Sequence, residues 1–93
     1  MSLESIRAEI DRVDSEILKL LVKRMELSLL TVKFKQSIKD DKREREVLSN
    51  VISQARYPLT DEFIKKLYGI ILEESKNLQI MYLKNKKEHQ RGA

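Results

Sequence analysis

Apolar residues recur in steps of three and four over the first third of the chain, from Ser2 to about Lys35. This is the spacing of one helix face, and the stretch contains neither proline nor glycine. One seam consists of Leu3, Ile6, Ile10, Val13, Ile17, Leu20, Arg24 and Leu27. The seam beside it consists of Leu18, Leu21, Met25, Ser28, Val32 and Lys35. The pattern predicts a single long helix with a wide apolar face in which cations are set.

This helix is too long for a compact domain of 93 residues. About 33 helical residues extend roughly 50 Å along the helix axis. A compact domain of this size is only about 32 Å across. The helix therefore overshoots its own domain, and we expect another chain to cover the excess apolar face.

Two shorter apolar stripes with helical spacing follow the long helix. Asp41 and Glu44 have the spacing of a capping box, which predicts the start of the second helix. Thr60 is the predicted N-cap of the third helix, after the only proline of the chain. The sequence therefore predicts an all-α chain of three helices, with a helical domain over residues 1–83 and a basic, frayed tail over 84–93.

The composition narrows the chemistry that the chain can perform. It has no cysteine, which excludes disulfides and cysteine-based metal sites, and its single histidine, His89, lies in the tail. We expect no metal and no cofactor. The tail holds four basic residues and one acidic residue, so it carries +3 of the net charge of +4, and nucleic acid is not a predicted partner. No apolar run is long enough to span a membrane and no signal peptide is visible, so we expect a cytoplasmic protein and no membrane partner.

Each predicted helix carries polar residues on its own apolar stripe. They are Arg24, Lys35, Arg43, Glu44, Ser75 and Gln79. Any one of them has an ordinary structural explanation, because long cations extend to the solvent and serine or glutamine can bond a backbone carbonyl. Burying several charges without partners, however, would cost several kcal/mol each. An anionic ligand held between the helices would satisfy the excess cations, and helix bundles commonly build sites in this way.

The spacing along the first helix shows which cations can share a ligand. Arg24 and Lys35 are separated by about 16 Å along the axis at nearly the same angle, so their long side chains can converge. Arg7 lies about 25 Å before Arg24 and cannot reach the same ligand from the same straight helix. Arg7 is therefore either a surface cation or part of a site in a partner chain.

Together these residues form a recognisable pattern. The chain reads R-x-x-I-x-x-V-D-x-x-I-L-x-L-L-x-x-R from Arg7 to Arg24, and E-S-x-x-x-Q from Glu74 to Gln79. With Lys35 and the pair Arg43–Glu44 between them, the chain resembles the all-helical chorismate mutase family over about residues 3–83. The resemblance implies an intertwined homodimer with two sites shared between chains. It also implies an isomerase that converts chorismate to prephenate in phenylalanine and tyrosine biosynthesis.

The resemblance assigns roles to the matching residues. Arg24 and Arg7 of the partner subunit correspond to the clamps for the two substrate carboxylates. Lys35 and Gln79 correspond to donors to the ether oxygen, and Glu44 to the acceptor for the ring hydroxyl. Further substrate contacts correspond to Asp40, Arg43 and Ser75.

The sequence departs from the family in the link between Lys35 and Arg43, which is shorter than usual and lacks the common proline. Lys33 or Lys39 could therefore take the place of Lys35. An isochorismate pyruvate-lyase on the same fold is the alternative activity. A helical metabolite-binding or regulatory module without turnover is the alternative from another class. The complete set of polar residues favours the mutase, since a bare dimerisation module would carry leucine at these positions.

Overall fold

The computed structural model of the chain describes residues 1–35 and 37–91. All regular secondary structure in these residues is helical, as the sequence predicts. The elements in chain order are α1 (Leu3–Thr31), the 3₁₀ turn η1 (Val32–Phe34), α2 (Asp41–Gln54) and α3 (Asp61–Arg91).

Helix α1 begins where the sequence predicts, at the N-cap Ser2. The backbone amide of Ser5 donates to Ser2 Oγ at 3.0 Å, and the amide of Ser2 donates back to Ser5 Oγ at 3.0 Å. This reciprocal pair satisfies two donors that a helix start leaves free. The α-helical part ends at Thr31, and η1 tightens the chain before Lys35, which has extended backbone angles.

Helix α2 is capped one residue earlier than predicted. Asp40 has non-helical backbone angles, and its side chain accepts a hydrogen bond of 3.1 Å from the amide of Arg43. The predicted capping box of Asp41 and Glu44 is therefore wrong, because Asp41 is already the first helical residue. Either aspartate can cap a helix, and only Asp41 has a glutamate three residues later, but the structure uses Asp40.

Helix α3 is capped by Thr60, whose Oγ1 accepts from the amide of Phe63 at 3.1 Å, which confirms the predicted cap. The helix then continues as far as Arg91, past the predicted boundary at residue 83. The division of the chain at that boundary stays a prediction. Residues 92 and 93 of the predicted frayed tail lie outside the described residues.

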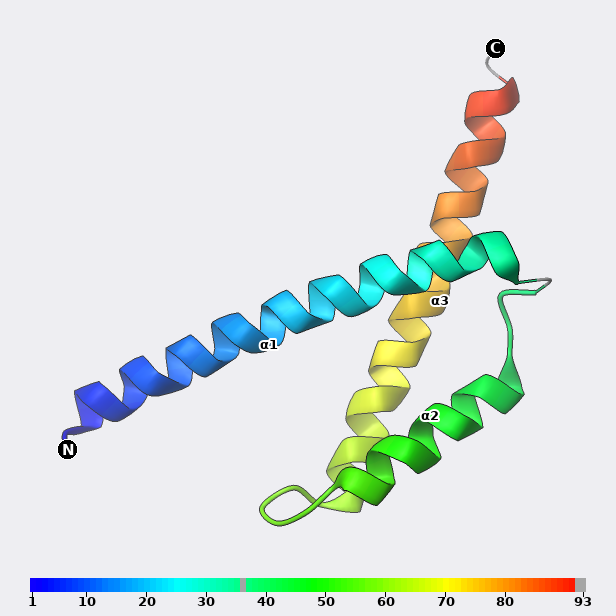
Figure 1. Cartoon of the computed structure of the whole chain (residues 1–93). Helices are drawn as coiled ribbons and strands as arrows, with labels where there is room; N and C mark the ends of the chain where they lie inside the picture. Colours follow the sequence, from blue (N-terminus) through cyan, green and yellow to red (C-terminus); the bar gives the residue numbers. More distant parts are fainter. Residues whose placement is uncertain (36, 92–93) are drawn as a thin grey trace.

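The three helices form an open arrangement around α3 (Figure 1). Helix α2 lies beside the first half of α3, and the last part of α1 crosses the middle of α3. The N-terminal half of α1 extends away from the other helices. The small core consists of Val47 from α2 with Ile64 and Ile71 from α3.

A single chain is far from compact. Its radius of gyration is 17.3 Å, whereas a compact domain of this length has about 12 Å. Its accessible surface is 8177 Å², against roughly 5,600 Å² for a compact protein of this mass. Helix α1 has no buried residue, and its apolar seam is open, with Ile10 52% and Leu20 66% exposed. The apolar face predicted for α1 therefore exists, but its own chain does not cover it.

None of the helices in the described ranges has the length and hydropathy that crossing a bilayer requires.

Candidate active site

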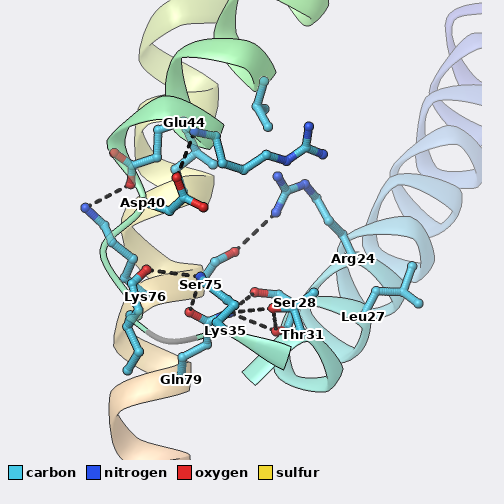
Figure 2. Close-up of a pocket in the computed structure, with 14 residues that line it drawn as sticks. Arg24, Leu27, Ser28, Thr31, Lys35, Asp40, Glu44, Ser75, Lys76 and Gln79 are labelled. Atoms are coloured by element: carbon cyan, nitrogen blue, oxygen red, sulfur yellow. Dashed lines mark hydrogen bonds and ion pairs between the residues drawn. The ribbon is translucent and has the colours of Figure 1, made fainter. Parts of the chain in front are cut away.

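A pocket of about 410 Å³ lies where the end of α1, the link after η1, the start of α2 and the middle of α3 meet (Figure 2). This volume falls in the range of small-molecule sites, roughly 300–1,000 Å³. Every site residue predicted from the sequence lines this pocket, with the exception of Arg7. The residues brought together are Arg24, Lys35, Asp40, Arg43, Glu44, Ser75 and Gln79.

Arg24 is held at the pocket by residues of α3. Its Nη1 donates to Ser75 Oγ at 3.2 Å, and its guanidinium carbon lies 6.0 Å from the centre of the Tyr68 ring. The Ser75 hydroxyl in turn donates to the sulfur of Met25 at 3.3 Å. A guanidinium has five N–H donors, so these contacts orient Arg24 and leave donors for a ligand.

Gln79 is the most deeply buried of the predicted residues, at 3% exposure. Its Nε2 donates to the carbonyl oxygen of Ser28 at 2.8 Å and approaches Ser28 Oγ at 3.0 Å and Thr31 Oγ1 at 3.2 Å. A carbonyl oxygen can only accept, so this contact fixes which end of the amide faces α1. The oxygen of the Gln79 amide therefore faces Lys35.

Lys35 lies between the short link and α3. Its Nζ donates to the carbonyl oxygen of Ile38 at 3.0 Å and to Gln79 Oε1 at 3.4 Å. An ammonium has three N–H groups, so one remains for a ligand. The short link brings the Ile38 carbonyl within reach of the ammonium and so helps to fix it. The alternatives Lys33 and Lys39 are exposed and do not line the pocket.

The start of α2 supplies Asp40, Arg43 and Glu44 to the same pocket. The prediction that Arg43 faces a packed core is wrong, because its side chain is 68% exposed and its Nη1 lies 3.6 Å from Glu46. Arg43 stands one helical turn before the buried Val47, but at this end of α2 its face borders the open pocket. Glu44 is better covered, at 26% exposure.

Sequence reasoning missed Lys76, which lines the pocket from α3. Its Nζ lies 3.0 Å from Glu44 Oε1 and 3.3 Å from Glu73 Oε2. The hydrogen bond to Glu44, followed by that to Glu73, raises the pKa of Lys76 above 10.5. Lys76 borders the apolar stripe of α3 beside Ser75, where a lysine is usually a solvated residue, so periodicity alone does not mark it.

Sequence reasoning also gave no role to Ser28 and Thr31, the α1 residues that meet Gln79. A signal was present for Ser28, since it is a polar residue within the second apolar seam of α1. Thr31 is also marked, since it lies four residues after Leu27, at the next position of the first seam.

Arg7 does not reach this pocket. It lies in the exposed N-terminal part of α1, which extends away from α2 and α3. Arg7 and Arg24 are 17 positions apart on the helix, which corresponds to about 25 Å. Within one chain, Arg7 is therefore a surface cation.

The pocket is positively charged. Four cations line it against two carboxylates, an excess of two positive charges. These groups are Arg24, Lys35, Arg43 and Lys76, against Asp40 and Glu44. The described residues hold no cluster of histidine, cysteine and carboxylate side chains suited to a metal ion. The arrangement is suited to a small organic dianion that also carries neutral polar groups.

Comparison with known proteins agrees with this geometry. The chain is 36% identical over 88 residues to the bifunctional chorismate mutase/prephenate dehydratase of Buchnera aphidicola, and it spans only 23% of that relative's length. The crystal structure of chorismate mutase from Helicobacter pylori in complex with prephenate superposes with a TM-score of 0.81 at 36% identity, covering 88% of this chain and 93% of that one. The sequence model of the type II chorismate mutase family matches residues 6–80. The chain thus belongs to the type II chorismate mutase family.

Proposed function

We propose that this chain is a chorismate mutase, which rearranges chorismate to prephenate for the biosynthesis of phenylalanine and tyrosine. The observation that carries the proposal is the pocket with two excess positive charges, built from all three helices. The related Helicobacter pylori enzyme, which was crystallised with prephenate, supports the choice of ligand. The Buchnera relative, whose name also includes a prephenate dehydratase, supports the pathway.

The rearrangement is a concerted pericyclic shift that needs no nucleophile and no proton transfer. The site has to hold two carboxylates, fold the enolpyruvyl arm over the ring and stabilise negative charge that develops on the ether oxygen. In our proposal Arg24 binds one carboxylate, Lys35 donates to the ether oxygen, and Glu44 accepts from the ring hydroxyl. Asp40, Arg43 and Ser75 make supporting contacts.

Gln79 is proposed as the second donor to the ether oxygen. Its Nε2 has two hydrogens and three acceptors on α1 within 3.2 Å. The bond to the Ser28 carbonyl is the shortest, at 2.8 Å, and the second hydrogen is shared between two hydroxyl oxygens. A neutral hydroxyl is a weaker acceptor than an ether oxygen that gains negative charge, so we propose that the second hydrogen turns to the ligand.

We further propose that the active form is a homodimer in which each pocket receives Arg7 of the partner subunit. The uncovered apolar face of α1 supports this assembly, since a monomer would expose it to water. The distance of Arg7 from its own pocket supports its action across the interface. The cytoplasmic location stays a prediction from the sequence.

An assay of purified protein with chorismate tests the activity. We expect loss of chorismate absorbance with prephenate as the product, and near-complete loss of the rate in Arg24→Ala. Formation of pyruvate and salicylate from isochorismate, with no prephenate from chorismate, would identify the pyruvate-lyase instead. Binding of prephenate without any turnover would identify a metabolite-binding module.

A further inference from the structure

Lys76 makes an ion pair unlike the others in the described part of the chain. Those others join side chains three or four positions apart on one helix. The pair Lys76–Glu44 joins α3 to α2 at 3.0 Å. Its side chains are 28% and 26% exposed, whereas Lys66 and Glu62, a pair within α3, are 75% and 80% exposed. Solvent screens the Lys76–Glu44 pair less, so it has a larger effect on the geometry of its partners.

The place of this pair in the pocket suggests a role beyond joining two helices. Lys76 approaches Glu44 from the side opposite Arg24 (Figure 2). The ammonium lies at Glu44 Oε1, and no ion pair within the described residues involves Oε2. A carboxylate oxygen therefore remains for a ligand hydroxyl.

Glu44 has other cations within the same pocket. Arg24, Lys35 and Arg43 all line it, and a glutamate side chain can rotate about three bonds. If Glu44 turned to Arg24 or Lys35, it would neutralise a cation that a ligand carboxylate needs. An ion pair with Lys76 would hold Glu44 away from these two cations.

We propose that Lys76 is a positioning residue for the mutase reaction. Its ammonium holds Glu44 by Oε1, so that the second carboxylate oxygen faces the ligand while Arg24 and Lys35 stay free for it. This inference rests on the proposed function, and it assigns a reaction-related role to a side chain that the apolar periodicity of α3 does not mark.

The test compares Lys76→Met with wild type in the chorismate assay. Methionine keeps much of the side-chain volume and removes the charge. We expect kcat/KM to fall by about tenfold, because a misplaced Glu44 both loses its contact and competes for Arg24. Lys76→Arg keeps the charge and should recover most of the loss. Lys66→Met, which removes an exposed lysine from the same helix, is the matched control and should stay within twofold of wild type.

A double-mutant cycle with Glu44→Gln distinguishes two roles of Lys76. One is to orient the Glu44 carboxylate, and the other is only to stabilise the contact between α2 and α3. An amide has no charge for Lys76 to hold, so adding Lys76→Met to Glu44→Gln should lower kcat/KM by less than about twofold further. Additive losses would overturn the inference, as would a Lys76→Met variant that melts at a lower temperature with unchanged kcat/KM. In both cases the wild type remains active and the proposed function stands. An inactive wild type would overturn the function and this inference together.

Discussion

Gln79 has both a structural and a proposed catalytic role. Its amide nitrogen bonds α1, its oxygen accepts from Lys35, and it is 3% exposed. A leucine at this position would remove one partner from each of two groups. The Ser28 carbonyl would keep Thr31 Oγ1 at 2.7 Å, and the Lys35 ammonium would keep the Ile38 carbonyl at 3.0 Å. The same amide therefore sets the position of Lys35 and limits where a ligand can accept a hydrogen bond.

This arrangement predicts the behaviour of Gln79→Glu. An ionised carboxylate would face the Ser28 carbonyl oxygen and the developing charge of the ether oxygen, and only Lys35 and the hydroxyls of Ser28 and Thr31 could donate to it. We expect roughly a hundredfold lower kcat near pH 8, with activity rising as the pH falls and the introduced acid becomes a donor again. A pH–rate profile of the variant from pH 5 to 8 measures this. A flat profile with unchanged activity would remove Gln79 from the site.

The introduced carboxyl of Gln79→Glu should also make the stability of the variant depend on pH. We expect burial at 3% exposure to outweigh the nearby Lys35 ammonium and to raise the pKa of the introduced carboxyl above its unfolded value, about 4.3. The stability is then highest below the unfolded pKa, and it falls as the pH rises towards the folded-state value. Wild type, with a neutral amide, lacks this contribution, so thermal melts of both proteins across pH 4–8 provide the comparison.

Lys76 gives the wild-type protein a pH dependence of stability in the same sense, because its pKa is also raised. Glu44 first, and then Glu73, raise its pKa above 10.5. The ion pair therefore contributes stability below the unfolded pKa of lysine and loses it as the pH rises through the folded value. We expect Glu44→Gln to lower the pKa of Lys76 more than Glu73→Gln does, as followed by NMR of the lysine side chain. An equal effect of the two variants would contradict the order of the two contacts.

The residues of the pocket were largely predictable, because polar groups on apolar stripes are conspicuous. Lys76 was not, since its partner Glu44 is 32 positions away in the chain and its own helix shows only an exposed-looking lysine. Arg43 was placed on the right face but in the wrong environment. Periodicity gives the direction of a side chain, whereas the packing of other elements decides whether core, pocket or water lies there.

At the scale of elements, the caps provide a prediction that separates stability from binding. Asp40 caps α2 and lines the pocket, whereas Thr60 caps α3 away from it. Replacing either by alanine should cost about 1 kcal/mol of stability. Only Asp40→Ala should also raise the KM for chorismate, because it alone borders the ligand. Equal KM values for both variants in the standard assay would leave Asp40 with a capping role only.

The apolar periodicity predicted the three helices and their order. It did not predict where α2 starts or where the α-helical part of α1 ends. The α2 cap lies at Asp40 although only Asp41 has a glutamate three residues later, so the local sequence signal favoured the wrong one of two adjacent aspartates. The change from α-helix to the 3₁₀ turn over Val32–Phe34 leaves no mark in the apolar pattern, since both geometries keep neighbouring positions on one side.

At the scale of the whole molecule, the apolar face of α1 predicts obligate pairing. Ile10→Asp places a charge on the seam that is 52% exposed in a single chain. Lys19→Asp, nine residues on, places the same charge on the opposite face of α1, half a turn away, and is the matched control. We expect sedimentation to show a dimer for wild type and Lys19→Asp, and a dissociated, largely unfolded chain for Ile10→Asp. A compact, folded wild-type monomer at micromolar concentration would contradict the dimer.

Sharing of the site can be tested by complementation. Arg7→Ala and Arg24→Ala should each nearly abolish activity. After equal amounts are unfolded and refolded together, half of the dimers are mixed, and each mixed dimer has one intact site. About a quarter of the wild-type activity should therefore return. If mixed dimers form and remain inactive, Arg7 does not act across the interface.

The sequence also predicts an oligomeric state, which is a property that a single chain does not show. The length of α1 and its apolar seam predict that a second chain covers this face. The radius of gyration of 17.3 Å agrees that a single chain leaves α1 extended and uncovered. What no pattern in one chain contains is the relative placement of two copies. That placement depends on how two seams interdigitate, which is a property of the pair.

The order of the elements along the chain has a consequence for synthesis. The apolar face lies in α1, which leaves the ribosome first, whereas Ser75 and Gln79 are among the last residues of the pocket to be made. At about 5–20 residues per second, several seconds separate the two events. In a paired enzyme, neighbouring nascent chains on one messenger can therefore associate through α1 before either has a complete pocket. Assembly would then precede catalytic competence, and a chain cut short after α1 would still capture a full-length partner.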